Sequence, residues 1–143
     1  MKEGEVIGNI SKIAVSYIKG TGLTELESAI VTPRGIPGDR EYVIVDAKPD
    51  QDGIHRWVSQ RDRRDTNDIP QGLGVLALIL PQYTSEALYL AWKDEQSDPL
   101  AVPHEQREEG DPKRIQIWED VMDGAIDQGD ESAEWLSTHL RYD

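Results

Sequence analysis

Apolar and polar residues alternate along most of this chain with a period of two, which predicts β-strands whose side chains point to opposite faces. The alternation is clearest over residues 10–18, 24–32 and 41–46. Residues 73–80 are almost entirely apolar, a pattern typical of a central strand that is covered on both faces. Further strands are predicted over residues 54–60, 86–92, 99–103 and 113–118.

Segments rich in Gly, Pro and Asp separate these runs and predict turns, as in "TPRGIPGD" and "KPDQDG". About eight short strands at near-regular spacing favour a closed or nearly closed β structure, because closure removes exposed strand edges. A helix is predicted over residues 130–140, where Asp130 can cap the first turn and Ala133, Leu136 and Leu140 share one face. We therefore expect a mainly β fold, a closed or partly open antiparallel barrel-like domain with one C-terminal helix. It should span residues 1–143 as a single domain.

The chain is strongly acidic: its 143 residues include 15 Lys and Arg against 28 Asp and Glu, which gives a formal net charge of −13. Such a charge repels phosphate backbones and anionic lipid headgroups, so we expect neither nucleic-acid binding nor membrane-surface binding. An anionic ligand would need a local cluster of positive side chains that works against the global field.

The composition also excludes several kinds of functional site. Without cysteine the chain has no disulfide, thiolate nucleophile or Cys-based metal site, and its three His residues lack the spacing of metal ligands. The start of the chain lacks the apolar region of a signal peptide, and the apolar run 75–80 is too short to cross a bilayer. We therefore expect a cytoplasmic protein without a metal site. Carboxylates such as Asp46 and Asp120 would suit acid–base chemistry, but among 28 acids close pairs arise by chance.

Three further groups of residues are better explained by structural roles than by functional ones. Asp120, Asp123, Asp127 and Asp130 lack the alternate spacing of a calcium loop and are interpreted as turn and capping residues. The four Trp residues each lie in an apolar segment, so we expect them to pack in the core. The basic stretch 60–65 alternates with acids, which is typical of a solvated loop.

Lys19 and Arg40 differ from the other cations because both lie in Gly-bearing segments beside predicted strands. Such loops present backbone N–H groups together with a cationic head, a combination that holds small phosphates. A structural interpretation is open for each residue. Lys19 would then be an exposed turn lysine, and Arg40 an ion-pair partner of Asp39, Glu41 or a cross-strand acid.

Three segments of the chain together resemble a known family. The first, "ISKIAVSYIKGTGLTELESAIVTPRGIPGDREYVIVD", has a Lys-bearing turn after one strand and an Asp-Arg pair before another. The second is "VSQRDRR", with its Gln-Arg pair, and the third is "IQIWEDVMDGAIDQGDESAEWLSTHL", with Trp, Gly-Asp-Glu and Trp-Leu in order. Together, over nearly the whole chain, these segments resemble the MOSC N-terminal β-barrel domain family.

In full-length members, the resemblance implies, this domain precedes a MOSC domain whose cysteine ligates the molybdenum of a pterin cofactor. The resemblance also implies that Lys19 and Arg40 help to hold the phosphate of that cofactor. The chain departs from the family pattern in three ways: Gly20 stands where Ser is usual, the turn at residues 17–19 lacks a Pro, and no cysteine is present. The sequence given ends where the resemblance would place the catalytic domain, so we expect a free-standing domain.

We therefore expect a non-catalytic binding or interaction module that holds no cofactor when alone. Its expected partner is a MOSC-domain protein or a small anionic ligand. The alternative is a split enzyme, in which Lys19 and Arg40 hold the phosphate of a molybdenum-pterin cofactor while a separate MOSC chain supplies the metal ligand. In a plain meander the two side chains would lie at opposite ends of strand 24–32, so their convergence requires that segment to bend back.

Overall fold

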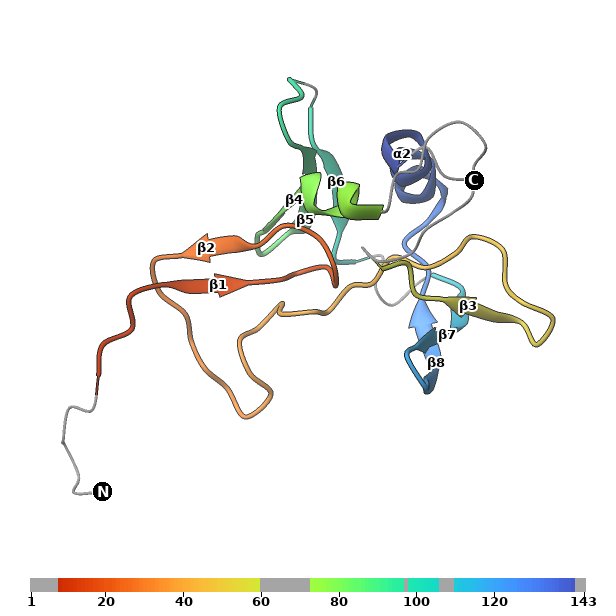
Figure 1. Cartoon of the computed structure of the whole chain (residues 1–143), viewed down its shortest axis with the longest axis horizontal. Coiled ribbons are helices and arrows are strands. Elements are labelled where there is room, and N and C mark those ends of the chain that lie inside the picture. Colours follow the sequence, from red (N-terminus) through yellow and green to blue (C-terminus); the bar gives the residue numbers. More distant parts are fainter. Residues whose placement is uncertain (1–7, 60–72, 97, 106–109, 141–143) are drawn as a thin grey trace.

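The computed structural model describes residues 8–59, 73–96, 98–105 and 110–140, which form three small sheets and a C-terminal helix (Figure 1). In the first sheet, β1 (Ile13–Val15) pairs antiparallel with β2 (Thr24–Leu26). The second sheet has the order β3 (Ile54–Arg56), β7 (Pro112–Ile117) and β8 (Asp120–Ile126). The third sheet is an antiparallel meander of β4 (Ile79–Tyr83), β5 (Ala87–Trp92) and β6 (Leu100–Pro103). The helices are η1 (Leu73–Leu78), a 3-10 helix, and α2 (Asp130–Leu140).

Backbone hydrogen bonds outside these ladders join the three sheets around a shared interior. The Gly22 N–H donates to the Ile79 carbonyl at 3.0 Å, which ties the β1–β2 connection to β4. The Val58 N–H donates to the Ile44 carbonyl at 2.9 Å, which ties residues 42–46 to the chain just after β3. Within the described residues no ladder joins β6 to β8, so the barrel-like arrangement is partly open. The prediction of a mainly β, partly open barrel-like fold with one C-terminal helix is confirmed.

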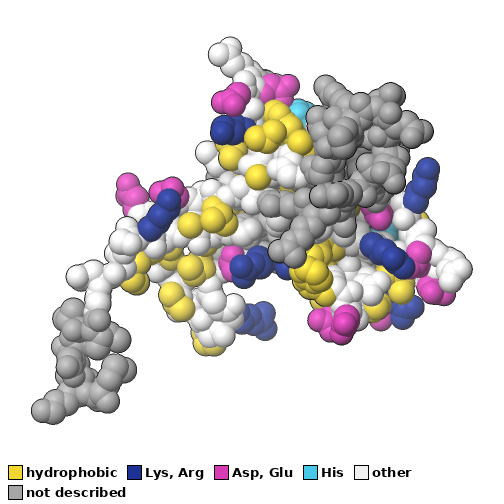
Figure 2. Space-filling model, in the orientation of Figure 1, with side chains coloured by type: hydrophobic (Ala, Val, Ile, Leu, Met, Phe, Trp, Pro, Cys, Tyr) yellow, Lys and Arg dark blue, Asp and Glu magenta, His cyan; other side chains and the backbone are white. Residues whose placement is uncertain are grey.

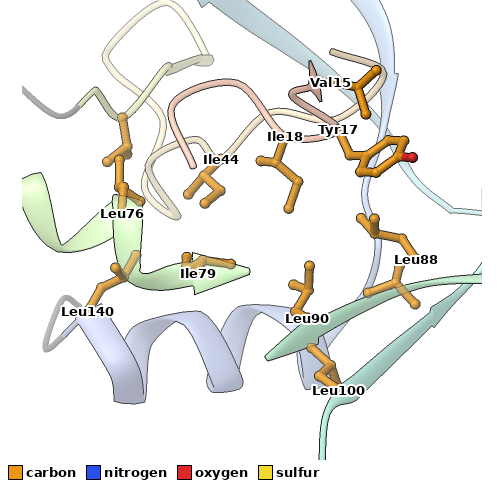
Figure 3. Close-up of a cluster of buried hydrophobic side chains, with 12 residues drawn as sticks. Val15, Tyr17, Ile18, Ile44, Leu76, Ile79, Leu88, Leu90, Leu100 and Leu140 are labelled. Atoms are coloured by element: carbon orange, nitrogen blue, oxygen red, sulfur yellow. The ribbon is translucent and has the colours of Figure 1, made fainter. Parts of the chain in front are cut away.

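An apolar cluster lines the interior between the sheets (Figure 3). Ile18 and Ile44 face it from the two segments that link the sheets, Leu90 faces it from β5, and Leu140 faces it from α2. Leu76 of η1 belongs to the same cluster and is 0% exposed. Contacts among residues this far apart in sequence fix the sheets relative to one another, because burial of apolar surface stabilises only the packed arrangement.

The prediction of a central strand over residues 73–80 is wrong for most of its length. The segment begins as the 3-10 helix η1 and becomes strand β4 only at Ile79. Leu76 and Ile79 are both fully buried, whereas Gly74 and Ala77 are exposed. A spacing of three places side chains on one face of a 3-10 helix, so this run buries one stripe rather than two faces.

Three further predicted strands are shorter or less regular than their alternation indicates. Residues 10–18 contribute only β1, and residues 24–32 contribute only β2. Residues 41–46 form no continuous ladder, because Tyr42 bridges to one neighbouring segment and Val45 to another. The alternation of residues 41–46 therefore reflects a segment that pairs first with one neighbouring segment and then with another. The predicted strands at residues 54–60, 86–92, 99–103 and 113–118 are present, the first of them as β3 alone within the described residues.

β8 was not predicted as a strand, because residues 120–124 are all exposed and so show no apolar alternation. Asp120 and Asp123 therefore lie in a strand, not in turns. The Asp123 carboxylate pairs with Arg114 of β7 at 2.8 Å. The hairpin between β7 and β8 turns at Trp118, which has φ +57° and is 67% exposed. The prediction that all four Trp residues lie in the core is therefore wrong for Trp118.

The C-terminal helix has the predicted bounds, residues 130–140, but not the predicted cap. The Ala133 N–H donates to the Gly129 carbonyl at 3.2 Å, so Gly129 is the capping residue and Asp130 is the first helical residue. The Asp127 carboxylate accepts a hydrogen bond from the Gly129 N–H at 2.9 Å and so orders the approach to the helix. No helix in the described part of the chain is long and apolar enough to cross a membrane.

Candidate functional site

The segment that carries Arg40 runs parallel to the residues that follow β1. Ile18 and Tyr42 form a parallel bridge, the Arg40 N–H donates to the Ser16 carbonyl at 2.6 Å, and the Lys19 N–H donates to the Tyr42 carbonyl at 3.0 Å. The chain leaves β2 after Leu26 and returns toward the end of β1. This pairing brings Lys19 and Arg40 onto neighbouring segments, so the backbone bends back as their convergence requires.

Gly38 sets the path of the loop just before Arg40. It has φ +86°, and a Cβ atom there would lie 2.9 Å from Cε1 of Tyr17. The Tyr17 ring has little room to move, because it is buried and stacks on Tyr83 with 5.1 Å between centroids. Gly therefore meets two requirements at once, a left-handed backbone and close approach to an aromatic ring.

Acidic side chains on both sides of Arg40 hold this loop to its surroundings. The Asp39 carboxylate accepts a hydrogen bond from the Ser16 N–H at 3.1 Å. The Glu41 carboxylate accepts one from the Gly38 N–H at 2.8 Å and a longer one from the Tyr83 hydroxyl at 3.4 Å. Both carboxylates therefore stabilise the conformation of residues 38–41.

Tyr42 is fixed by a hydrogen bond to His104, just after β6. His104 Nε2 lies 2.9 Å from the Thr84 carbonyl, which can only accept, so this nitrogen carries the proton. His104 Nδ1 is then the acceptor for the Tyr42 hydroxyl, at 3.1 Å. The bond connects the Arg40-bearing segment to the third sheet.

Arg40 itself points outward from a left-handed backbone. Its φ is +54°, and its side chain is 64% exposed. Nη1 lies 3.3 Å from the Asp39 carboxylate. The ion pair expected from the neighbouring acids therefore exists with Asp39. Because the guanidinium carries five N–H donors, one such pair leaves donors for a ligand.

Lys19 is not held by a carboxylate in the described part of the chain. Its ammonium instead lies over the ring of Trp57, 4.6 Å from the ring centroid. Trp57 packs edge-on against Trp118, with 5.1 Å between centroids and 65° between planes. The positive charge of Lys19 thus rests on an aromatic face, an arrangement that leaves its N–H donors unpaired with acids.

Lys19 and Arg40 both line a cavity of about 780 Å³ that is partly open to solvent. Its apolar walls include Ile18, Ile44, Leu88, Leu90, Val102 and Ile115. Its charged lining residues are Lys19, Arg40, Lys113, Glu41, Asp46, Asp127 and Asp130. Lys113 is paired with Asp127 at 3.6 Å. On the part of the molecular face that is coloured in Figure 2, basic and acidic side chains are interspersed.

The sequence suggested that backbone N–H groups of these loops help to hold an anion. The N–H groups of Lys19, Arg40 and Tyr42 all donate to backbone carbonyls, and the Gly38 N–H donates to the Glu41 carboxylate. These four donors are therefore already used within the fold.

Within the described residues, no group of three or more His, Asp or Glu side chains could hold a metal ion. The basic stretch 60–65 and most of "VSQRDRR" lie outside the described residues. Chemically, the arrangement provides two cations at a cavity that has apolar walls and also carries four carboxylates. It can hold an anion that carries an apolar body.

Sequence reasoning missed Trp57, Tyr42 and His104 as parts of this site. Trp57 was interpreted as core, whereas its ring supports Lys19 and is only half-buried. No sequence signal places Trp57 beside Lys19, because the contact depends on how residues 42–46 lie between β1 and β3. His104 follows β6, and only the tertiary fold brings it to Tyr42.

Comparison with known proteins gives one match. The model of the MOSC N-terminal beta barrel domain matches residues 7–143, nearly the whole chain. No curated protein and no solved structure matches the chain. The match agrees with the partly open barrel of eight strands seen in the described residues and with the resemblance in the Lys-bearing turn and the Asp-Arg pair. The chain therefore belongs to the MOSC N-terminal beta barrel domain family.

Proposed function

We propose that this domain is a non-catalytic binding module for a small anionic ligand with an apolar body. Lys19 and Arg40 contact the anion, and the apolar walls of the cavity contact the rest of the ligand. The observation that supports the proposal is the parallel pairing at Ile18 and Tyr42, which brings two cations to the edge of one apolar cavity.

The register of that pairing sets the separation of the two cations. Arg40 lies opposite Ser16 and Lys19 lies one residue beyond the Ile18–Tyr42 bridge, so about three residues separate them along the pair. At about 3.3 Å per residue, their backbones are about 10 Å apart. In a regular strand an odd separation would place the two side chains on opposite faces, so a shared anion depends on the left-handed backbone of Arg40, which departs from the strand pattern.

The expected affinity follows from the number of charged contacts. Hydrogen bonds to charged groups contribute about 1.5–3 kcal/mol each, so two contribute about 3–6 kcal/mol, which corresponds to a dissociation constant between several millimolar and tens of micromolar for a bare phosphate. Burying about 100 Å² of apolar ligand surface would add about 2.5 kcal/mol, or between tenfold and a hundredfold in affinity. Selectivity for an anion with an apolar body over inorganic phosphate is therefore the distinguishing feature of this function.

A two-dimensional amide NMR titration with inorganic phosphate and with naphthyl phosphate tests the proposal. We expect naphthyl phosphate to bind at least tenfold more tightly and to shift the amide signals of Lys19, Arg40 and the cavity wall. Lys19→Met and Arg40→Gln should each weaken binding about tenfold or more, as the loss of one charged contact requires. The absence of any shift at Lys19 and Arg40 with both ligands would exclude the proposal.

Two matched variants control for a general change in charge. Lys12→Met removes a lysine that pairs with Glu25 at 2.5 Å on the β1–β2 hairpin, away from the cavity lining. Arg34→Gln removes an exposed arginine in the turn at residues 32–35. Both should bind naphthyl phosphate as the unmodified domain does. Equal losses in the controls would mean that net charge, and not the site, governs binding.

The split-enzyme alternative stays a prediction that uses the same two residues. It requires a separate MOSC chain that supplies the metal ligand, because this chain has no cysteine. A titration with a phosphorylated pterin, with and without a candidate MOSC chain, separates the two functions. Binding that requires both components supports the split enzyme, whereas binding of naphthyl phosphate and the pterin by the domain alone supports the binding module.

A further inference from the structure

We propose that Trp57 positions the Lys19 ammonium for anion binding and thereby contributes to the ligand specificity of the cavity. This inference rests on the proposed function of the Lys19–Arg40 site. The contact that carries it is the Lys19 Nζ atom lying 4.6 Å from the centre of the Trp57 ring. Trp57 does not line the main cavity itself, so it acts through Lys19 and is a positioning residue.

The Trp57 ring is a fixed support, because its backbone and its edge are both held. The Trp57 N–H donates to the Gln116 carbonyl of β7 at 3.0 Å, and Val45 bridges to Trp57 from the other side. The exposed Trp118, at the turn between β7 and β8, packs edge-on against the ring. The two Trp rings also line a small cleft of about 220 Å³ together with Arg56, Ser59 and Gln116.

The segment 42–46 lies between the two partners. Lys19 donates to Tyr42 at one end of this segment, and Trp57 pairs with Val45 near the other end. The lysine stem therefore extends toward Trp57, along residues 42–46. The contact with the ring restricts a side chain that otherwise has many rotamers.

An aromatic partner also suits this particular lysine better than an acidic one. The cavity lining includes Glu41, Asp46 and Asp127, and a carboxylate bound to Lys19 would compete directly with an anionic ligand. The face of a Trp ring attracts the ammonium without accepting its N–H donors as a carboxylate does. Trp57 therefore holds the charge in place and leaves it available.

A double-mutant cycle tests the inference with naphthyl phosphate as the probe. Cation–π contacts at exposed sites correspond to about two- to fivefold in affinity, so Trp57→Leu should weaken binding by that factor. Trp57→Phe, which keeps a smaller ring, should lose less. In a Lys19→Met background, Trp57→Leu should cause no further loss. An equal loss in both backgrounds, or no loss in either, would overturn the inference.

A second measurement does not depend on ligand binding. The Lys19 ε-methylene protons should resonate upfield of an ordinary lysine in the free domain, because they lie over the Trp57 ring, and Trp57→Phe should shift them less. Trp135→Leu is the matched control, since Trp135 of α2 contacts His139 and Trp92 and not Lys19. If the domain binds no phosphate but the upfield shift is present, the proposed function fails and the contact stands. An unshifted Lys19 in the free domain overturns the positioning role, whatever the affinity.

Discussion

Ile18 and Tyr42 lie side by side as a parallel bridge, and the Lys19 N–H extends this pairing to the Tyr42 carbonyl. This single bridge fixes the backbone positions of Lys19 and Arg40, which are far apart in the sequence. Residues 27–39 do not continue β2. They lead the chain back, so that Arg40 lies beside the end of β1. The site thus depends on the shape of one connection more than on any regular strand.

Gly38→Ala should destabilise the domain by about 2–4 kcal/mol, because it combines a left-handed backbone with overpacking. The added Cβ would lie 2.9 Å from the Tyr17 ring, which is stacked on Tyr83. Urea denaturation measures the loss. Gly53→Ala is the matched control: Gly53 has φ +75° but no atom within 4 Å of its Cβ position. It should lose only about 1 kcal/mol. Equal losses would show that the Tyr17 contact carries no cost.

Leu76→Ala should cost about 2–5 kcal/mol, because Leu76 is 0% exposed and its removal leaves a cavity in the core of the barrel. Leu80→Ala removes the same atoms from a side chain that is 40% exposed, and it should cost less than about 1 kcal/mol. Thermal or urea unfolding of the two variants makes the comparison. A small loss for Leu76→Ala would mean that η1 does not pack in solution as it does here.

The sequence predicts some elements of the second half of the fold well. β5, β6, β7 and α2 were predicted close to their bounds, whereas β8 was missed and residues 73–78 form η1 instead of a strand. In the first half, residues 24–32 alternate as a strand would, but Ile30 and Val31 are 79% and 77% exposed. The turn at residues 32–35 pairs with itself, so this segment has no ladder partner. Alternation reports which residues could pair, not whether a partner is present.

The candidate site, too, could be predicted only in part from the sequence. The Lys-bearing turn and the Asp-Arg pair identify Lys19 and Arg40 through family resemblance, and the cations are at the same cavity. Asp39 was among the acids predicted to pair with Arg40, whereas Trp57 as the partner of Lys19 could not be predicted, because that contact depends on the tertiary fold. Spacing also suggested free backbone donors, which the parallel pairing consumes.

Tyr17→Phe should remove part of the alkaline instability of the domain. Burial raises the pKa of the Tyr17 hydroxyl above its usual value, and the neighbouring Tyr83 raises it further. The folded state therefore favours the neutral phenol. This contribution is complete below about pH 10, the ordinary tyrosine pKa, and is lost as pH rises through the folded pKa.

Urea unfolding of the unmodified domain and of Tyr17→Phe between pH 8 and pH 11, as approximate limits around the tyrosine range, measures this effect. The unmodified domain should lose stability more steeply at the alkaline end, and its absorbance should show one tyrosine that ionises late. The Phe ring keeps the stacking on Tyr83. Identical alkaline slopes would exclude Tyr17 as the source.

Asp50→Asn should make the domain less sensitive to acid. Hydrogen bonds from the Ile54 and Asp52 N–H groups, together with the nearby Arg56 guanidinium, lower the pKa of the Asp50 carboxyl. A lowered folded pKa means that the carboxylate stabilises the fold above the ordinary Asp value of about 4. That stabilisation is lost as pH falls through the folded pKa. Asn keeps an acceptor for the two N–H groups but cannot ionise.

The difference in unfolding free energy between the unmodified domain and Asp50→Asn, followed as pH is lowered from neutral, isolates this carboxylate. We expect the unmodified domain to be the more stable near neutral pH and its advantage to shrink below the ordinary Asp pKa. Because Asp50 closes the turn that leads into β3, the Ile54 amide should exchange with solvent faster at the acid end. A constant difference across the whole range would mean that the turn is held by its backbone bonds, such as Gly53 N–H to the Asp50 carbonyl, and that the charge contributes nothing.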